Sequence, residues 1–452
     1  MAQGETTGSR LNSIRQFWDH NLDPRRRAII GGIFIAMALL TLISGGFENV
    51  TLGGAGMSTY IALVVTLILA RRGFYADHLS VFVDRDGKRV EVRQKVRPVL
   101  KIDRVQPLHN PETMTGDEAL EYYTPLTRVI GIVHEGQARA YPLAALSYRE
   151  VVHDLVGDAP MAVTWSPFCY TARVFLVSSD SEMHFVPQFG FTGRVLINSP
   201  VMYDVRSGVR WIQYHGAPLE GPEAGTRLPE IPSLNTTLGA WLNAYPESDV
   251  IRDSVAPTQD LFDNYYAGGR AGMHRAPHRD ARWPAKEIVA GVDLGGDACA
   301  FPMSWLQIEP VVNETVGGTP LVVSYEQGSA SVVAFHAQIS NGQTLTFEAE
   351  EWEDDEDESN DVLLDEINDV VDEEDLEYEP MMIYDIETES RWHATNGMCV
   401  EGELKGEQLE PVVAGLSFWF AWTNFHPSTR LPPRPDLSGL MPDSQKPEND
   451  EK

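Results

Sequence analysis

Cysteine is scarce in this sequence of 452 residues. Only Cys169, Cys299 and Cys399 occur, and no two of them form a C-x-x-C pair. Because they are few and far apart, they offer neither a disulfide framework nor a zinc-finger spacing, and we predict no metal site. The sequence also has no G-x-S-x-G motif, P-loop, dinucleotide fingerprint or H-E-x-x-H motif. It therefore indicates no particular reaction and leaves the cofactor unknown.

Basic residues are also few, with 35 Lys and Arg against 66 Asp and Glu and a net charge of −31. Such a charge repels nucleic acid, so we expect no nucleic-acid partner. Much of the excess lies in residues 348–379, which hold 19 acidic residues and no Lys or Arg. The hydrophobic fraction of 43% is enough for one large or two ordinary domains.

Two uncharged runs near the N-terminus predict a transmembrane helical hairpin over residues 28–72. The first run, 28–47, follows three arginines and is long enough to cross a hydrocarbon layer of about 30 Å. The second run, 51–70, is interrupted by glycines near its start and is closed by two arginines. We therefore expect residues 28–70 to lie in the lipid bilayer of the cell membrane.

The basic flanks of this hairpin predict its orientation. Residues 1–27 form a basic leader and residues 73–106 a basic juxtamembrane segment, whereas the connection between the two runs has no Lys or Arg. The positive-inside rule then places both ends, and the soluble part, on the cytoplasmic side. In the alternative, the glycine-rich run stays out of the bilayer, one crossing remains, and the soluble part is extracytoplasmic.

The soluble part contains an internal duplication. Residues 129–142 align with 289–302 at a shift of 160, and the unit YD…RW at 203–211 recurs at 384–392 at a shift of 181. The difference of 21 residues places an acidic insertion, at about 350–377, in the second copy. We therefore predict two tandem copies of one module.

Each copy has the pattern of short strands, such as the alternation at 161–165, with short helices expected at 143–147 and 237–244. The predicted fold class is mostly β with a few short helices (α+β). The predicted parts of the soluble chain are a first β-rich module at 107–253, a connector at 254–284, a second β-rich module at 285–431, and a disordered tail at 432–452.

Several motifs in order resemble a prokaryotic family catalogued as domain of unknown function 3179. They are GQARAYP at 136–142, VVHDLVG at 151–157, TWSPFC at 164–169 and VMYDVRSGVRW at 201–211. The resemblance covers both modules and implies no established reaction, cofactor or substrate. The sequence departs from the family pattern because Ser166 stands where the family has a first cysteine, and the corresponding segment of the second copy has no cysteine.

Residues present in both copies are best explained by the shared fold. Asp204 with Arg210, and Asp385 with Arg391, are expected to pair across a hairpin, and the tryptophans are expected to anchor the core. The residues predicted as structural are Tyr203, Asp204, Arg210, Trp211, Tyr384, Asp385, Arg391 and Trp392.

Residues found in only one copy are better functional candidates. Cys169 occurs in the first copy together with His134, His153, His184 and His215. A thiolate near an imidazole permits nucleophilic or redox chemistry, and the same groups also suit a soft metal ion. The alternative is that Cys169 is a small buried hydrophobe and the histidines bind turn backbone.

Two functions follow from these observations. The first, which we favour, is a membrane-anchored protein whose inter-lobe cleft binds a ligand or partner, since two lobes form a groove without any catalytic group. The second is a thiol-dependent, redox or metal-binding enzyme that uses Cys169. The sequence identifies neither a small molecule nor a protein partner.

Overall fold

The computed structural model describes residues 78–177, 187–350 and 380–433. The chain divides into two compact units, Met1–Ser80 with Arg93–Pro98 and Val81–Val92 with Val99–Lys452. The second unit contains both predicted β-rich modules, here called the first half (107–253) and the second half (285–431). The N-terminal strands are β1 (His78–Arg85), β2 (Lys88–Lys95) and β3 (Arg97–Pro98).

The first half consists of short strands and three short α-helices. Its sheets contain the strand orders β15-β10-β9-β8-β4, β14-β13-β12-β11 and β16-β6-β7-β17-β5. Its elements are β4 (Leu108–His109), β5 (Glu112–Met114), α4 (Gly116–Leu120), β6 (Arg128–His134), β7 (Gln137–Pro142), α5 (Leu143–Arg149), β8 (Val151–Val156), β9 (Ala159–Ser166), β10 (Thr171–Leu176), β11 (Phe189–Leu196), β12 (Ser199–Asp204), β13 (Arg210–Ile212), the 3-10 helix η1 (Gln213–His215), β14 (Ala217–Pro218), β15 (Glu230–Ile231), β16 (Ser233–Thr237), α6 (Leu238–Ala244) and β17 (Asp249–Arg252).

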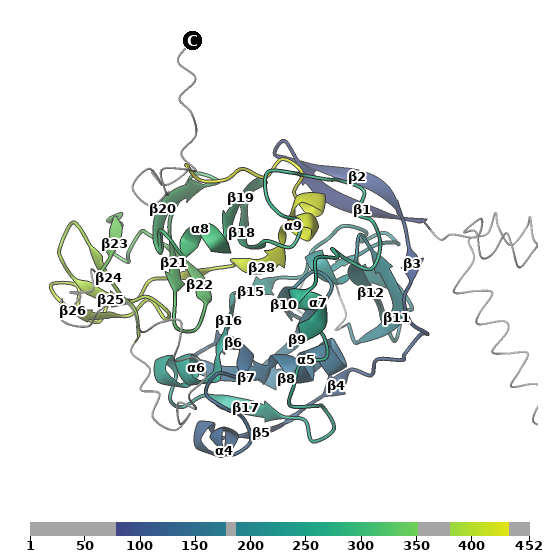
Figure 1. Cartoon of the computed structure of the whole chain (residues 1–452), viewed down its shortest axis with the longest axis horizontal. Helices are drawn as coiled ribbons and strands as arrows, with labels where there is room; N and C mark the ends of the chain where they lie inside the picture. Colours follow the sequence, from purple (N-terminus) through teal and green to yellow (C-terminus); the bar gives the residue numbers. More distant parts are fainter. Residues whose placement is uncertain (1–77, 178–186, 351–379, 434–452) are drawn as a thin grey trace, which may run out of the picture. The chain divides into compact units, whose positions relative to one another are not determined.

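The second half has a similar order of elements, and a short helix, α7 (Asp263–Ala267), lies in the connector. Its sheets are β19-β18-β28, β20-β21-β22-β27 and β23-β24-β25-β26, the last of which lies at the left of Figure 1. Its elements are β18 (Ile288–Leu294), β19 (Asp297–Pro302), α8 (Met303–Leu306), β20 (Val311–Val316), β21 (Thr319–Glu326), β22 (Ser331–His336), β23 (Phe347–Ala349), β24 (Met382–Asp385), β25 (Arg391–His393), β26 (Cys399–Glu401), β27 (Pro411–Val412), β28 (Gly415–Phe418) and α9 (Trp419–Phe425).

The strand registers of the two halves repeat at the shifts seen in the sequence. Val129 pairs with Pro142 between β6 and β7, and Val289 pairs with Pro302 between β18 and β19. Leu234 of β16 pairs with Gly131 of β6. Its counterpart at the shift of 181, Gly415 of β28, pairs with Gly291 of β18, which is the counterpart of Gly131 at the shift of 160. The turns also agree, because two successive residues have positive φ both at 135–136 and at 295–296. This conformation suits a two-residue hairpin loop.

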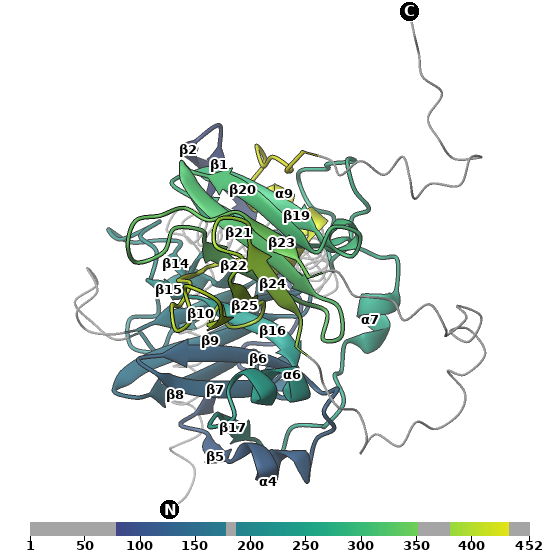
Figure 2. The ribbon, with the colours of Figure 1, turned by 90° about the vertical axis from the view of Figure 1, so that its left-hand side faces the viewer.

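A buried tryptophan anchors the short helix that follows β16 in the first half and the short helix that follows β28 in the second half. Trp241 of α6 donates its indole N–H to Ser248 Oγ at 2.7 Å, and Trp422 of α9 donates to Thr429 Oγ1 at 2.8 Å. Each indole ring lies against a glycine of the adjacent strand, where a Cβ atom would be 2.2 Å or less from the ring. Figure 2 shows α6 beside β6 and β16.

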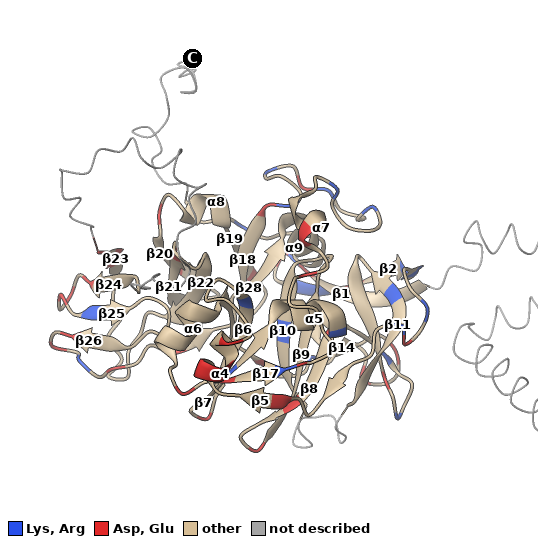
Figure 3. Ribbon diagram, turned by 60° about the horizontal axis from the view of Figure 1, so that its bottom comes forward, with Lys and Arg blue, Asp and Glu red and all other residues tan. Residues whose placement is uncertain are grey.

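The halves contact each other through β10 with β28 and through β16 with β22. Phe418 N donates to Cys169 O at 2.8 Å, and Ser331 Oγ donates to Thr236 Oγ1 at 2.7 Å. Most strands in Figure 3 are largely tan, that is, without Lys, Arg, Asp or Glu. At the junction, β10 contains one charged residue, Arg173, which is 6% exposed. The junction between the halves therefore includes a charged side chain inside the molecule.

The prediction of a mostly β fold with a few short helices is confirmed, and the helices expected at 143–147 and 237–244 are α5 and α6. The predicted leader and transmembrane hairpin at 1–72, and nearly all of the acidic insertion and tail, lie outside the described residues. Within the described ranges, none of the helices has the length and apolar character needed to cross a membrane. Part of the predicted juxtamembrane segment, Val81–Val92, belongs to the same unit as both halves.

Candidate functional site

A pocket of about 480 Å³ lies where the two halves meet, and we call it the apolar pocket. The first half contributes β6, β16 and the helix α6 with Trp241 and Tyr245 to its wall. The second half contributes residues 332–335 of β22, residues 395–398, and residues 408–414 around β27. The wall thus combines aromatic and aliphatic side chains from both halves, as is typical of a small-molecule site.

One buried hydroxyl group in this wall has no partner. Thr395 is 3% exposed, and its Oγ1 makes no hydrogen bond with any residue that the structure describes. The neighbouring amides are engaged, because Gln408 Nε2 donates to Asn396 O at 2.5 Å and Asn396 Nδ2 donates to Ala244 O at 3.4 Å. A buried hydroxyl without a partner is costly, so Thr395 is suited to hydrogen-bond a bound molecule.

The sequence shifts of 160 and 181 relate residues in the wall of the apolar pocket to a second group of residues, which we call the charged site. Its residues lie close together in the structure, since His426 Nδ1 is 3.7 Å from Asp293 Oδ2 and the His215 and His426 rings are 5.8 Å apart. The charged site consists of Arg173, His215, Arg227, Asp293 and His426, which correspond in that order to Val333, Asn396, Gln408, Val133 and Tyr245 of the apolar pocket.

Aromatic and charged side chains pack closely at the charged site. Tyr214 of the first half stacks on Phe425 of the second half with ring centroids 3.9 Å apart. Arg173 lies over the Tyr214 ring at 4.9 Å and forms an ion pair with Glu230 at 2.9 Å. Burial, followed by the positive charge of Arg227, holds the pKa of His215 well below its usual range. The imidazole of His215 is therefore neutral near pH 7.

Cys169 lies at the junction of the halves with no exposed surface. Burial raises the pKa of its thiol to about 12, with the nearby Ser166 hydroxyl acting weakly in the opposite direction. Its carbonyl oxygen accepts hydrogen bonds from Phe418 N and from Thr171 Oγ1. This environment favours the structural interpretation of Cys169, because a reactive cysteine needs a thiolate and access to solvent.

The other candidate histidines do not gather around Cys169. His153 on β8 accepts a hydrogen bond from Phe189 N at 3.0 Å, and burial lowers its pKa to about 4. His134 is half-buried near the end of β6, and His215 belongs to the charged site. His184 lies outside the described residues. At the shift of 160, Asn313 takes the place of His153 and bonds Phe347 N in the same way, at 2.9 Å.

The residues predicted as structural are placed as follows. Trp211 and Trp392 are fully buried. The expected pairing of Asp204 with Arg210 needs correction, because Arg210 pairs with Glu220 at 2.7 Å. Asp204 instead accepts hydrogen bonds from the turn that follows it, including Ser207 N at 2.8 Å.

The corresponding unit of the second half departs from the expectation in the same way. Arg391 pairs with Glu350 at 2.8 Å rather than with Asp385. The Asp385 carboxylate accepts hydrogen bonds from Thr388 N at 2.6 Å and from Trp392 Nε1 at 2.9 Å. In both halves a short aspartate satisfies nearby backbone N–H groups of a tight turn, which outweighs a contact across the hairpin. Tyr203 Oη donates to Asp103, and Tyr384 Oη donates to Glu348.

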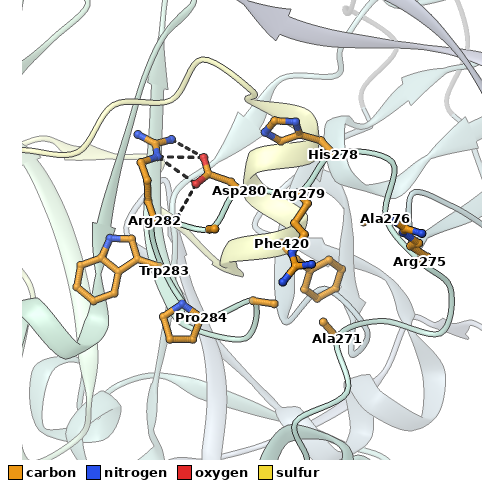
Figure 4. A pocket seen from close by; sticks show the side chains of 12 residues that line it. Ala271, Arg275, Ala276, His278, Arg279, Asp280, Arg282, Trp283, Pro284 and Phe420 are labelled. Carbon is orange, nitrogen blue, oxygen red and sulfur yellow. Dashed lines mark hydrogen bonds and ion pairs between the residues drawn. The ribbon is translucent and has the colours of Figure 1, made fainter.

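The connector forms part of another pocket, of about 610 Å³, shown in Figure 4. Its wall includes Arg275, Arg279, Asp280 and Arg282, and Asp280 pairs with Arg282 at 2.7 Å. The guanidinium groups here belong to exposed residues, so water screens their charge. This pocket therefore offers weaker recognition than the apolar pocket, whose polar group is buried.

Sequence reasoning missed the charged site for an identifiable reason. We sought residues present in only one copy among the cysteine and histidines of the first copy. The same rule applied to the second half would have selected Asp293 and His426, which align with Val133 and Tyr245 of the first half. The approach of Asp84 to these residues carries no signal in the sequence, because β1 lies outside both copies.

No curated protein and no solved structure matches the chain. A family model described as "Protein of unknown function (DUF3179)" matches residues 103–429, a stretch that includes the first half, nearly all of the second half and all of the apolar pocket. Because this match spans well over half of the sequence, the chain belongs to the DUF3179 family of proteins of unknown function.

Proposed function

We propose that this protein is a membrane-anchored ligand-binding protein made of two copies of one β-rich module. The apolar pocket is the binding site, and its ligand is a small apolar or aromatic molecule with one hydrogen-bonding group. The observation that carries this proposal is the pocket of about 480 Å³ at the junction of the halves, with the Thr395 hydroxyl in its wall, which no residue that the structure describes hydrogen-bonds. Binding sites of this size combine apolar walls with a few polar groups that orient the ligand.

The repeated registers support the idea of two copies. Arg139 pairs in parallel with Asp249, and Cys299 pairs in parallel with Arg430, which are the same positions at shifts of 160 and 181. Two similar lobes that face each other create two related junctions. One junction can then remain open as a binding site while the other is closed by packed side chains.

A fluorescent apolar probe, N-phenyl-1-naphthylamine, tests this function with the full-length chain. We expect saturable binding at one site, with energy transfer from tryptophan to the probe. Met398 lines the pocket and is 37% exposed, so Met398→Trp should fill the mouth and weaken probe binding roughly tenfold or more. Val400→Trp is the matched control, because Val400 is 38% exposed and does not belong to the pocket wall.

Two results would contradict the proposal. The first is a wild-type chain that binds no probe. The second is equal binding by the wild type and the Met398→Trp variant, which would place the probe elsewhere.

Membrane attachment through residues 28–72 is the second part of the proposal. It is supported by the two uncharged runs and by the arginines that flank them. The full-length chain should remain in the membrane pellet after an alkaline carbonate wash. Protease added to sealed inverted vesicles should digest the soluble part if it is cytoplasmic. Release by carbonate would contradict anchoring, and protection in inverted vesicles would favour the single crossing.

A further inference from the structure

Three potential metal ligands converge at the charged site, two of whose residues are among them. Asp84 comes from β1, Asp293 from β18 and His426 from the end of α9, and their ligand atoms all lie within 4.8 Å of one another. They come from three segments that are distant in the sequence. Asp84 is 7% exposed and His426 2% exposed, so the tertiary fold places them together in the interior.

The imidazole of His426 is aimed at both carboxylates but bonds to neither. Its Nδ1 atom is 3.8 Å from Asp84 Oδ2 and 3.7 Å from Asp293 Oδ2, beyond hydrogen-bond distance. This nitrogen is buried and has no hydrogen-bond partner in the described part of the chain. The ring is fixed by stacking on Trp422, with centroids 4.0 Å apart. A buried polar atom in this position is suited to bind something between itself and the carboxylates.

The charges of the cluster are not balanced by the side chains around it. Arg227 pairs with Asp84 at 2.6 Å and approaches Asp293 at 3.5 Å, so one guanidinium, on a side chain that is 28% exposed, serves two carboxylates. Arg89 is 3.8 Å from Asp84, but its side chain is 46% exposed and contributes little. Burial, together with the Asp84 charge, raises the pKa of Asp293. Two carboxylates with one close cation favour the binding of a further positive charge.

His426 does not supply that charge. Burial, followed by Arg227 and Arg173, holds the pKa of His426 well below its usual range. The neutral imidazole is the form that binds metal ions.

We propose that Asp84, Asp293 and His426 bind one divalent transition-metal cation of the Zn²⁺ type. Two carboxylates and one imidazole are a donor set that Zn²⁺ accepts, whereas Mg²⁺ and Ca²⁺ prefer oxygen ligands alone. Ligands bonded to one such ion at about 2.0–2.2 Å lie about 3–4 Å from each other, and both imidazole-to-carboxylate distances fall in this range. Water would complete the coordination.

Arg227 competes with the metal ion for the same oxygen atom. Asp84 Oδ2 faces both the guanidinium and the imidazole. In the apolar pocket the corresponding residue is Gln408, which carries no charge. Replacing Arg227 by glutamine should therefore strengthen metal binding rather than weaken it, a result that a simple ion-pair cluster would not give.

Calorimetric titration of the metal-free, full-length chain with Zn²⁺ tests the proposal. The wild type should bind one equivalent tightly, His426→Asn and Asp293→Asn should each lower the affinity at least roughly tenfold, and Arg227→Gln should raise it. Zn²⁺ should also raise the melting temperature of the wild type but not of these two weakened variants. His134→Gln, which removes an imidazole outside the cluster, is the control and should bind as the wild type does.

A spectroscopic readout keeps the test independent of stability. Co²⁺ in place of Zn²⁺ should give a visible absorption band that changes in His426→Asn. The proposal would be overturned if Zn²⁺ bound weakly, in several equivalents, and equally well to His426→Asn. Such binding would belong to the acidic residues 348–379. The absence of tight Zn²⁺ binding by the wild type would overturn the proposal as well.

Discussion

The two places where the halves meet occupy corresponding positions but differ in chemistry. At the apolar pocket, Val133, Tyr245 and Gln408 leave a cavity of about 480 Å³. The corresponding residues Asp293, His426 and Arg227 form a cluster of charges, next to the stacked rings of Tyr214 and Phe425. The backbone framework is similar in both places, so the side chains alone decide what each can bind.

This difference follows from the cost of burying charge. An apolar cavity can persist because its walls lose only dispersion contacts, and here the Thr395 hydroxyl in its wall has no hydrogen-bond partner within the described ranges of the chain. Buried charges must be paired, and so Arg173 requires Glu230 and Asp84 requires Arg227. A junction that acquires charges therefore closes around them, and the other junction remains available for an apolar ligand.

The largest expected effect comes from substitutions that test whether Trp241 and Trp422 anchor their helices equally. A Cβ atom at Gly131 would lie 2.2 Å from Trp241, and one at Gly291 would lie 2.1 Å from Trp422. Gly131→Ala and Gly291→Ala should each lower the free energy of unfolding by about 3 kcal/mol, because each indole is held in place by the hydrogen bond from its Nε1 atom. Urea denaturation measures this, with Gly269→Ala as a control because its Cβ would meet nothing within 4 Å. A large difference between the two variants would argue against equivalent halves.

His153 and Asn313 differ in how they respond to pH. The pKa of His153 is lowered to about 4 in the fold, so the folded state favours the neutral ring. Between pH 6.5 and pH 4 the unfolded chain therefore binds a proton at His153 that the folded chain does not. The free energy of unfolding is highest above pH 6.5 and falls as the pH is lowered towards 4, by about 2 kcal/mol at pH 5. His153→Asn should remove this acid sensitivity from urea denaturation curves, whereas His134→Gln should keep it. If His153→Asn remained as acid-sensitive as the wild type, His153 would not be the group responsible.

Thr395 and Thr423 provide a smaller contrast. Both hydroxyls are buried, but Thr423 Oγ1 donates to Trp419 O at 2.9 Å whereas Thr395 Oγ1 has no partner among the described residues. Thr395→Val should stabilise the ligand-free chain by about 1 kcal/mol, and Thr423→Val should destabilise it by about the same amount. Thermal unfolding distinguishes them. A destabilised Thr395→Val variant would mean that the hydroxyl already has a partner.

The smallest expected effect is at Cys169. With a pKa of about 12, only about one thiol in 10⁴ is ionised at pH 8, and the sulfur is enclosed. Iodoacetamide should leave Cys169 unmodified in the folded chain and should label it in 8 M urea. Rapid labelling of the folded chain would restore the hypothesis of a reactive thiol in the first half.

The sequence was sufficient to predict the strands, because their alternation and turn residues are local signals. It also predicted the short helices at α5 and α6, and the shifts at which the strand registers repeat. The partner of Arg210 was mispredicted because turn hydrogen bonds compete for Asp204. The apolar pocket and the Asp84–Asp293–His426 cluster were not predicted, since both depend on how distant segments meet. The membrane hairpin stays a prediction.

The central claim is that the two junctions bind different ligands independently. Its most direct test measures the binding of N-phenyl-1-naphthylamine and of Zn²⁺ by the same two full-length variants. We predict that Met398→Trp loses the probe and keeps Zn²⁺, and that His426→Asn loses Zn²⁺ and keeps the probe. If either variant lost both ligands while remaining folded, or if neither variant changed either affinity, the account of two separate sites would be contradicted.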